Sequence, residues 1–148
     1  MINRLTIDAS VFISRLREGD EAHEASREFL EALFDRPILT VLPTLVQPEI
    51  TGAVRRLAGD SHIARRALEV LDPLPNMNLV PLERRLAAEA AHLAAEFGMK
   101  GADAVYVAVA RLFDTTLVTL DLQQRERCPS AVRVVDPAEA LLELKEYT

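Results

Sequence analysis

The sequence has little of the residue chemistry on which disulfide-linked and zinc-binding proteins depend. Cys128 is the only cysteine among 148 residues, so an intrachain disulfide is excluded. The three histidines, His23, His62 and His92, do not have the spacing of zinc ligands. We therefore expect a protein that is stable in a reducing compartment without a disulfide or a structural metal.

Long apolar segments and an excess of positive charge are also missing. The N-terminus MINRLTIDAS lacks the apolar stretch of a signal peptide, and no segment approaches the roughly 20 apolar residues of a membrane helix. These features predict a cytoplasmic protein with no membrane partner. The 17 Lys and Arg residues stand against 23 Asp and Glu residues, which gives a net charge of −6. Because Lys and Arg supply most of the affinity for phosphates, this balance alone disfavours nucleic-acid binding.

Short apolar runs alternate with helical patterns along the chain. The length fits one domain, residues 1–148. The alternation predicts an α/β fold, with a single parallel sheet of about five strands and helices on both faces. The predicted strands are 5–7, 38–42, 78–80, 117–120 and 132–135. The predicted helices are 9–16, 20–34, 44–58, 61–72, 82–97, 101–113 and 137–145.

Local signals mark several of the predicted helix ends. Asp60 is expected to cap the helix that follows it, Pro137 to lie in a first turn, and Gly98 to end an Ala-rich helix. Pro48 lies in the first turns of the 44–58 segment and cannot donate a backbone hydrogen bond there. We therefore expect that helix to begin late or to kink.

Two aspartates follow apolar runs of the predicted sheet. Asp8 ends the first strand and Asp121 ends the fourth. In an open parallel sheet, ligands bind in the crevice beyond the carboxyl ends of the strands. Adjacent placement of these two strands would bring both carboxylates together. The alternative interpretation is that each aspartate is only the N-cap of the next helix.

Two further acids occupy positions that usually face the protein interior. Glu49 falls at the edge of the apolar stripe of its helix. The alternatives are a boundary glutamate whose carboxylate extends to solvent, or one that pairs with an arginine. Asp103 opens GADAVYVAVARLF, in which Ala and Val occupy nearly every side of the first turns; N-capping is the alternative there. One shared acidic pocket accounts for Asp8, Glu49, Asp103 and Asp121 together.

An acidic pocket of this kind predicts a divalent cation. Carboxylates a few ångströms apart repel one another unless a cation neutralises them. An oxygen-only ligand set favours Mg²⁺ or Mn²⁺, either of which can activate a water and stabilise a phosphate oxygen. Ser10 and Thr119 lie close in sequence to Asp8 and Asp121, and are candidate donors that orient the ligands or a phosphate. Strand propensity is the alternative explanation of Thr119.

The four acids lie in segments whose order and spacing are specific. These segments are TIDASVFISRL, LPTLVQPEITGAVRR and GMKGADAVYVAVARLFDTTLVTLD, the last of which holds two motifs. They resemble the motifs of PIN-domain nucleases, and within that family the VapC-type toxins of bacterial toxin–antitoxin systems. The resemblance maps onto Asp8 and Ser10, then Glu49, and finally Asp103, Thr119 and Asp121. Gln123 and Gln124 stand where some relatives have a further acid.

The resemblance implies a metal-dependent endoribonuclease with a PIN-like fold. The four acids would be its catalytic residues and metal ligands. RNA would be the substrate, a small antitoxin protein would inhibit cleavage, and the chain would form a homodimer. Arg55, Arg56 and Arg125 would contact RNA phosphates from a basic rim. The alternative is that these arginines solvate helix faces and pair with neighbouring acids.

Other functions of similar sheets fit the sequence less well. A phosphoryl-accepting regulatory domain requires paired acids after the first strand, where this chain has Ala9 and Ser10 after Asp8. A phosphatase with an aspartate nucleophile requires a second carboxylate at the position of Ser10. The remaining alternative is a catalytically silent member of the same fold that binds RNA or a protein partner.

Overall fold

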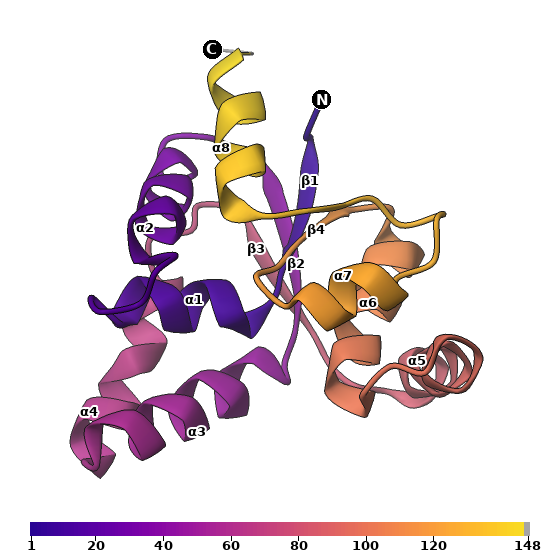
Figure 1. Cartoon of the computed structure of the whole chain (residues 1–148), viewed down its shortest axis with the longest axis horizontal. Coiled ribbons are helices and arrows are strands. Elements are labelled where there is room, and N and C mark those ends of the chain that lie inside the picture. Colours follow the sequence, from indigo (N-terminus) through magenta and orange to yellow (C-terminus); the bar gives the residue numbers. More distant parts are fainter. Residues whose placement is uncertain (147–148) are drawn as a thin grey trace.

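Five strands form one sheet in the computed structural model, which describes residues 1–146 (Figure 1). The strands are β1 (Arg4–Ile7), β2 (Leu39–Pro43), β3 (Met77–Val80), β4 (Thr116–Val118) and β5 (Val134–Val135). Their order across the sheet is β3-β2-β1-β4-β5, and every neighbouring pair is parallel. The predicted parallel sheet is therefore confirmed, with the first strand of the chain at its centre.

Helices pack against both faces of this sheet. They are α1 (Ala9–Leu16), α2 (His23–Ala32), α3 (Val46–Ala58), α4 (Ser61–Arg66), the 3₁₀ helix η1 (Ala67–Leu71), α5 (Arg84–Phe97), α6 (Gly101–Phe113), α7 (Leu122–Arg127) and α8 (Pro137–Glu146). In Figure 1, α1 to α4 lie on one side of the sheet and α5 to α7 on the other, while α8 packs against α2. Within residues 1–146, no helix has the length and apolar character needed to cross a membrane.

The predicted signals at helix ends are present in the structure. The Asp60 carboxylate accepts hydrogen bonds from the backbone N–H groups of His62 and Ile63, at 2.8 and 3.1 Å. Gly98 ends α5 with a φ of 67°, a left-handed conformation that glycine adopts without strain. Helix α3 begins at Val46, later than the predicted residue 44. Pro48 therefore lies in the first turn, where a backbone N–H has no helical acceptor.

The bounds of other elements differ from the sequence prediction. The predicted helix 20–34 is shorter, and the predicted helix 61–72 divides into α4 and η1. Strand β4 ends at Val118 rather than at residue 120, so Asp121 lies in the turn after the strand. Helix α7 was not predicted because LQQRER has no apolar stripe, and Gln124 is its buried residue.

Helix α6 packs against the three central strands of the sheet. Its residues from Ala104 to Ala110 are all buried, and it contacts β1, β2 and β4. Small and β-branched side chains on several sides of the helix allow this close packing. The first turn of α6, which carries Asp103, is thereby held near the carboxyl ends of β1 and β4.

Candidate active site

Asp8 is a buried carboxylate directly after the central strand. It is 7% exposed and caps α1, with Oδ2 accepting a hydrogen bond from the Ser10 backbone N–H at 3.0 Å. Its Oδ1 accepts a hydrogen bond from Nε2 of Gln124 at 3.4 Å. Burial raises the pKa of Asp8, the hydrogen bonds from Ser10 and Gln124 oppose this shift, and the charge of Asp121 adds to it. Asp8 is thus an N-cap and also an electrostatic neighbour of Asp121.

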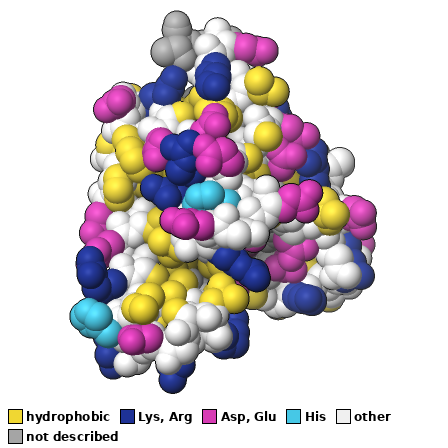
Figure 2. Space-filling model, turned by 60° about the vertical axis from the view of Figure 1, so that its left-hand side comes forward, with side chains coloured by type: hydrophobic (Ala, Val, Ile, Leu, Met, Phe, Trp, Pro, Cys, Tyr) yellow, Lys and Arg dark blue, Asp and Glu magenta, His cyan; other side chains and the backbone are white. Residues whose placement is uncertain are grey.

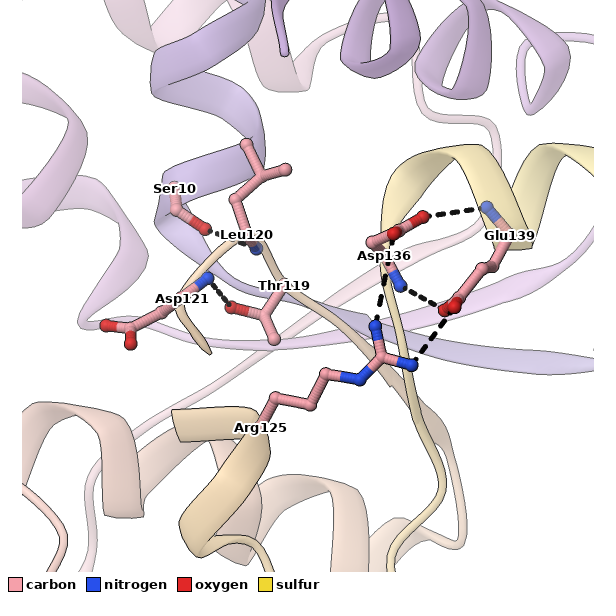
Figure 3. Close-up of polar contacts among 7 residues, drawn as sticks. All are labelled: Ser10, Thr119, Leu120, Asp121, Arg125, Asp136 and Glu139. Atoms are coloured by element: carbon pink, nitrogen blue, oxygen red, sulfur yellow. Dashed lines mark hydrogen bonds and ion pairs between the residues drawn. The ribbon is translucent and has the colours of Figure 1, made fainter. Parts of the chain in front are cut away.

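Asp121 reaches the same edge of the sheet from the neighbouring strand. Strands β1 and β4 pair with Ile7 opposite Val118, so the two strands are adjacent, as a shared pocket for Asp8 and Asp121 requires. Asp121 caps α7 by accepting a hydrogen bond from the Gln124 backbone N–H at 3.1 Å. Its own backbone N–H donates to Oγ1 of Thr119 at 3.0 Å, and its carboxylate points away from that contact (Figure 3).

Asp103 is not the N-cap of its helix, because Lys100 occupies that position and Asp103 lies in the first turn of α6. The N-cap alternative for this residue is therefore wrong. Burial and, to a smaller extent, the charges of Asp121 and Asp8 raise the pKa of Asp103 to about 6, against the lowering effect of Lys100 and Arg127. Asp103 is thus electrostatically coupled to both strand-end aspartates.

Glu49 extends the group from the first turn of α3. Its Oε1 accepts a 2.6 Å hydrogen bond from the hydroxyl group of Tyr106 on α6. Burial raises the pKa of Glu49, the Tyr106 hydrogen bond opposes this, and the charges of Asp8 and Asp103 add to the increase. The side chain of Glu49 is held by this hydrogen bond from Tyr106 and not by an ion pair with an arginine. Tyr106 was not predicted from the sequence, although it lies one helical turn after Asp103 and therefore shares its face.

The four carboxylates form one electrostatic group, which we call the acidic site: Asp8, Glu49, Asp103 and Asp121. Across residues 1–146, no three His, Cys, Asp or Glu side chains stand in an arrangement that would hold a metal ion. The carboxylates are therefore neighbours that repel one another and not a completed coordination sphere. Their chemistry nevertheless fits a hard divalent cation, because all ligand atoms are oxygens and a cation would offset the burial and repulsion that raise the pKa values of Asp8, Glu49 and Asp103.

Ser10 and Thr119 hold the turn between β4 and α7. Oγ of Ser10 accepts a hydrogen bond from the Leu120 backbone N–H at 3.1 Å, and Oγ1 of Thr119 accepts the hydrogen bond from Asp121 (Figure 3). Both hydroxyl oxygens thus fix the backbone that presents Asp121. The contact between Ser10 and Leu120 also ties α1 to the end of β4.

Gln124 is the second residue whose contacts with the acidic site were not predicted from the sequence, although it stands near a position where some relatives have a further acid. Its side chain is 1% exposed, and Nε2 donates to Oδ1 of Asp8 at 3.4 Å and to the backbone oxygen of Asp103 at 3.2 Å. The signal that was available is its position three residues after Asp121, which is the spacing of a capped first helical turn. That signal was missed together with α7.

The predicted arginines occupy different surroundings. Arg55 and Arg56 are exposed on α3, and Arg56 lines the same surface depression as Glu49. Arg125 instead faces α8, where it pairs with Glu139 at 3.0 Å and with Asp136 at 3.9 Å (Figure 3). Of the three, Arg56 is the cation beside the acidic site, whereas Arg125 joins α7 to the start of α8.

Comparisons with known proteins concern nearly the whole chain. The PIN domain family model matches residues 5–128. No curated protein matches the sequence. Among solved structures, the chain is similar to the Mycobacterium tuberculosis toxin VapC20, which cleaves the sarcin-ricin loop, with 16% identity and a TM-score of 0.70 over 87% of this chain and 98% of that one.

Two further solved structures have the same fold. The Pyrobaculum aerophilum protein PAE2754 is 20% identical with a TM-score of 0.72, over 97% of this chain and 90% of that one. A chain of a toxin–antitoxin complex from Klebsiella pneumoniae is 21% identical with a TM-score of 0.63, over 90% of this chain and 97% of that one. At these identities the likeness concerns the fold.

Proposed function

Because this chain belongs to the PIN domain family, we propose that it is a metal-dependent endoribonuclease and the toxin of a toxin–antitoxin pair. The observation that carries the proposal is the acidic site, in which burial and mutual repulsion raise the pKa values of Asp8, Glu49 and Asp103. Acids that repel one another at the carboxyl edge of a parallel sheet favour binding of a divalent cation. PIN domains generally use such ions, and we propose Mg²⁺ or Mn²⁺ here.

The chain's own residues would prepare the site for RNA cleavage. A bound divalent cation would supply a water of lowered pKa and a positive charge for the phosphate oxygens. Asp8, Asp103 and Asp121 provide the negative charge that holds it, and burial strengthens that attraction. Glu49 is fixed at Oε1 by Tyr106.

RNA would bind along the exposed cations beside the acidic site. Arg56 lines the depression that contains Glu49, and Arg55 is its neighbour on α3. These side chains can contact phosphates and steer RNA toward a molecule whose net charge is −6. Arg125 shares its charge with Glu139 and Asp136, so it contributes less to phosphate binding in this proposal. Cleavage of intracellular RNA would place the protein in the cytoplasm.

An antitoxin would use the apolar surface between α1, α3 and α4. The hollow there is lined by Ile13, Leu16, Arg17, Val54, Leu57, Ala58 and Ile63, with a volume of about 220 Å³. Leu57 and Ile63 are 53% and 51% exposed, and Figure 2 shows apolar side chains gathered in the lower part of this face. An amphipathic helix fits such a surface. A basic side chain of the antitoxin could then reach the acidic site and replace the charge of the cation.

A second copy of the chain would cover the hollow between α5 and α6. This hollow has a volume of about 360 Å³ and an almost entirely apolar lining that includes Leu45, Leu82, Ala90, Ala94 and Val105. Leu82 is 49% exposed at its edge. Exposed apolar surface of this kind favours a homodimer.

The proposed function is tested by cleavage of structured RNA with the purified chain. We expect cleavage in Mg²⁺ or Mn²⁺ and none in chelator. Asp121→Asn should lower the rate on the order of 100-fold or more, because it removes charge from the cation site. Asp114→Asn is the matched control: Asp114 is exposed at the far end of α6, and Asn tolerates its left-handed φ of 52°. RNA binding without cleavage in any metal would favour the catalytically silent alternative.

A further inference from the structure

Gln124 is the one buried residue of α7, and its contacts set it apart from the packing residues of the core. We propose that Gln124 is a positioning residue of the acidic site, whose amide fixes the Asp8 carboxylate relative to Asp103 and Asp121. The proposal deepens the proposed function and rests on it for the role of the site. Its structural basis can be tested independently of that function.

Three contacts connect Gln124 to three of the four acidic residues. Its backbone N–H donates to Oδ1 of Asp121 at 3.1 Å. Its side-chain Nε2 donates to Oδ1 of Asp8 at 3.4 Å and to the backbone oxygen of Asp103 at 3.2 Å. These partners come from the end of β1, from α6 and from the start of α7. One residue thus contacts all three, and its side chain links the end of β1 to α6.

Both oxygens of Asp8 are held as a result. Oδ2 accepts from the Ser10 backbone and Oδ1 from Gln124, so the carboxylate cannot rotate without losing a hydrogen bond. The amide of Gln124 is oriented by the same contact, because a reversed amide would place Oε1 against the carboxylate oxygen. Gln124 therefore acts on the site through Asp8 and does not itself need to contact RNA.

The burial of this amide argues for a role beyond packing. Gln124 is 1% exposed, and its Oε1 is a buried oxygen with no hydrogen-bond partner among the residues that the structure describes. A buried amide oxygen without a partner destabilises the folded state. Leu or Met would fill a similar volume without that penalty. The Nε2 contacts with Asp8 and Asp103 are what an apolar residue cannot supply.

The absence of charge on Gln124 suits a site that binds a cation. An arginine or lysine here would donate to Asp8 but would repel the cation. A glutamate would place another negative charge beside Asp8 and would raise the repulsion in the metal-free protein. Glutamine donates a hydrogen bond to Asp8 and carries no charge, so it neither repels the cation nor increases the repulsion among the carboxylates. This predicts that the size of the metal effect on stability depends on residue 124.

The first test is a double-mutant cycle in chelator, with Asp8→Ala, Gln124→Met and the double variant, read by thermal unfolding. Gln124→Met should lower the melting temperature in the parent, and its effect in the Asp8→Ala background should differ by about 3 °C or more. Gln123→Met is the matched control, because Gln123 is exposed on the same helix. Additive effects within about 1 °C would overturn the positioning role.

The second test measures the melting-temperature increase caused by Mg²⁺ alone, together with RNA cleavage. Gln124→Glu should melt lower than the parent in chelator and show a larger Mg²⁺ increase, whereas Gln124→Met should show a smaller increase and a lower kcat with an unchanged KM. Gln123→Met should match the parent in all of these. Gln124 variants that match the parent in both measurements would overturn this inference alone. A parent without a Mg²⁺ effect or cleavage would overturn the proposed function, and the cycle in chelator would still decide the role of Gln124.

Discussion

The hydroxyl group of Tyr106 lies 2.6 Å from Oε1 of Glu49, and this hydrogen bond joins α6 to α3 across the acidic site. Burial raises the pKa of Tyr106, and the neighbouring Glu49 raises it further. The phenol therefore remains protonated at neutral pH and donates to the carboxylate. A buried tyrosine thus fixes the acid that comes from the helix after β2, whereas the other three acids lie on or beside β1, β4 and α6.

Tyr106→Phe should weaken this link with little change in packing. The variant leaves the half-buried Glu49 without its donor, so the free energy of unfolding should fall by about 1–2 kcal/mol. The rate of RNA cleavage should fall as well, because Glu49 would no longer be held in one orientation. Chemical denaturation and single-turnover cleavage would measure the two effects. A variant as stable and as active as the parent would contradict this role of Tyr106.

Asp103 should make the metal-free protein lose stability as the pH rises. Its pKa increases from 3.8 to about 6 on folding, so its contribution to stability is fully present below pH 4 and is lost as the pH rises through about 6. Asp103→Asn should remove this dependence and stabilise the metal-free protein at pH 7 by about 1–2 kcal/mol, allowing for solvent screening. Unfolding curves in chelator between pH 4 and 8 provide the measurement. Identical pH dependences for parent and variant would contradict the predicted shift.

Asp121→Asn separates the capping role of Asp121 from its charge. Asparagine caps helices about as well as aspartate, so the hydrogen bond from the Gln124 backbone should survive. The melting temperature in chelator should therefore stay unchanged or rise, while the increase caused by Mg²⁺ should largely disappear. Differential scanning calorimetry with Mg²⁺ and with chelator measures both. A full Mg²⁺ increase in the variant would exclude Asp121 from the cation site.

Arg56 and Arg125 should differ in their effect on RNA binding. Arg56→Met should weaken RNA binding and reduce its salt dependence, because an exposed cation beside the acidic site is lost. Arg125→Met should change RNA binding less and should lower the free energy of unfolding by no more than about 1 kcal/mol, because its ion pairs are partly exposed. Binding isotherms at several salt concentrations would compare the variants. A larger binding defect in Arg125→Met would reverse this assignment.

Leu57→Glu and Ile63→Glu should prevent antitoxin binding without abolishing RNA cleavage. Both side chains line the hollow between α1, α3 and α4, so a buried charge would oppose docking of an apolar helix. Leu142→Glu is the matched control, because Leu142 is 63% exposed on α8, outside that hollow. Co-purification with the antitoxin would test the effect. Normal binding by both variants would place the antitoxin elsewhere.

Patterns of apolar residues were sufficient to predict the sheet and most helices. Buried runs such as that of β1 and the Ala- and Val-rich α6 reflect their own contacts with the core, so sequence alone identifies them. Helix α7 could not be predicted in this way, because the single side chain that it buries is the polar Gln124. Its helical structure depends on the Asp121 cap and on tertiary contacts with Asp8 and Asp103.

The carboxylates of the acidic site could be predicted because they follow strands or lie in first helical turns. Asp8 and Asp121 are such residues, whereas the pairing of β1 with β4 that brings them together could only be posed as a condition, because these strands are not consecutive in the sequence. The neutral partners were not predictable, because Tyr106 and Gln124 contact residues 57 and 116 positions away in the sequence. Only the tertiary structure brings Tyr106 to Glu49 and Gln124 to Asp8.

The central position of β1 also determines when during synthesis the site is completed. The ribosome makes this strand first, but its neighbour β4 and the turn that carries Asp121 come much later: Ser10 and Leu120 are bonded across 110 positions. The turn that carries Asp121 must therefore be synthesised before Asp8 meets its partners. For the proposed nuclease, a chain that has not yet been extended to Asp121 therefore lacks a complete acidic site.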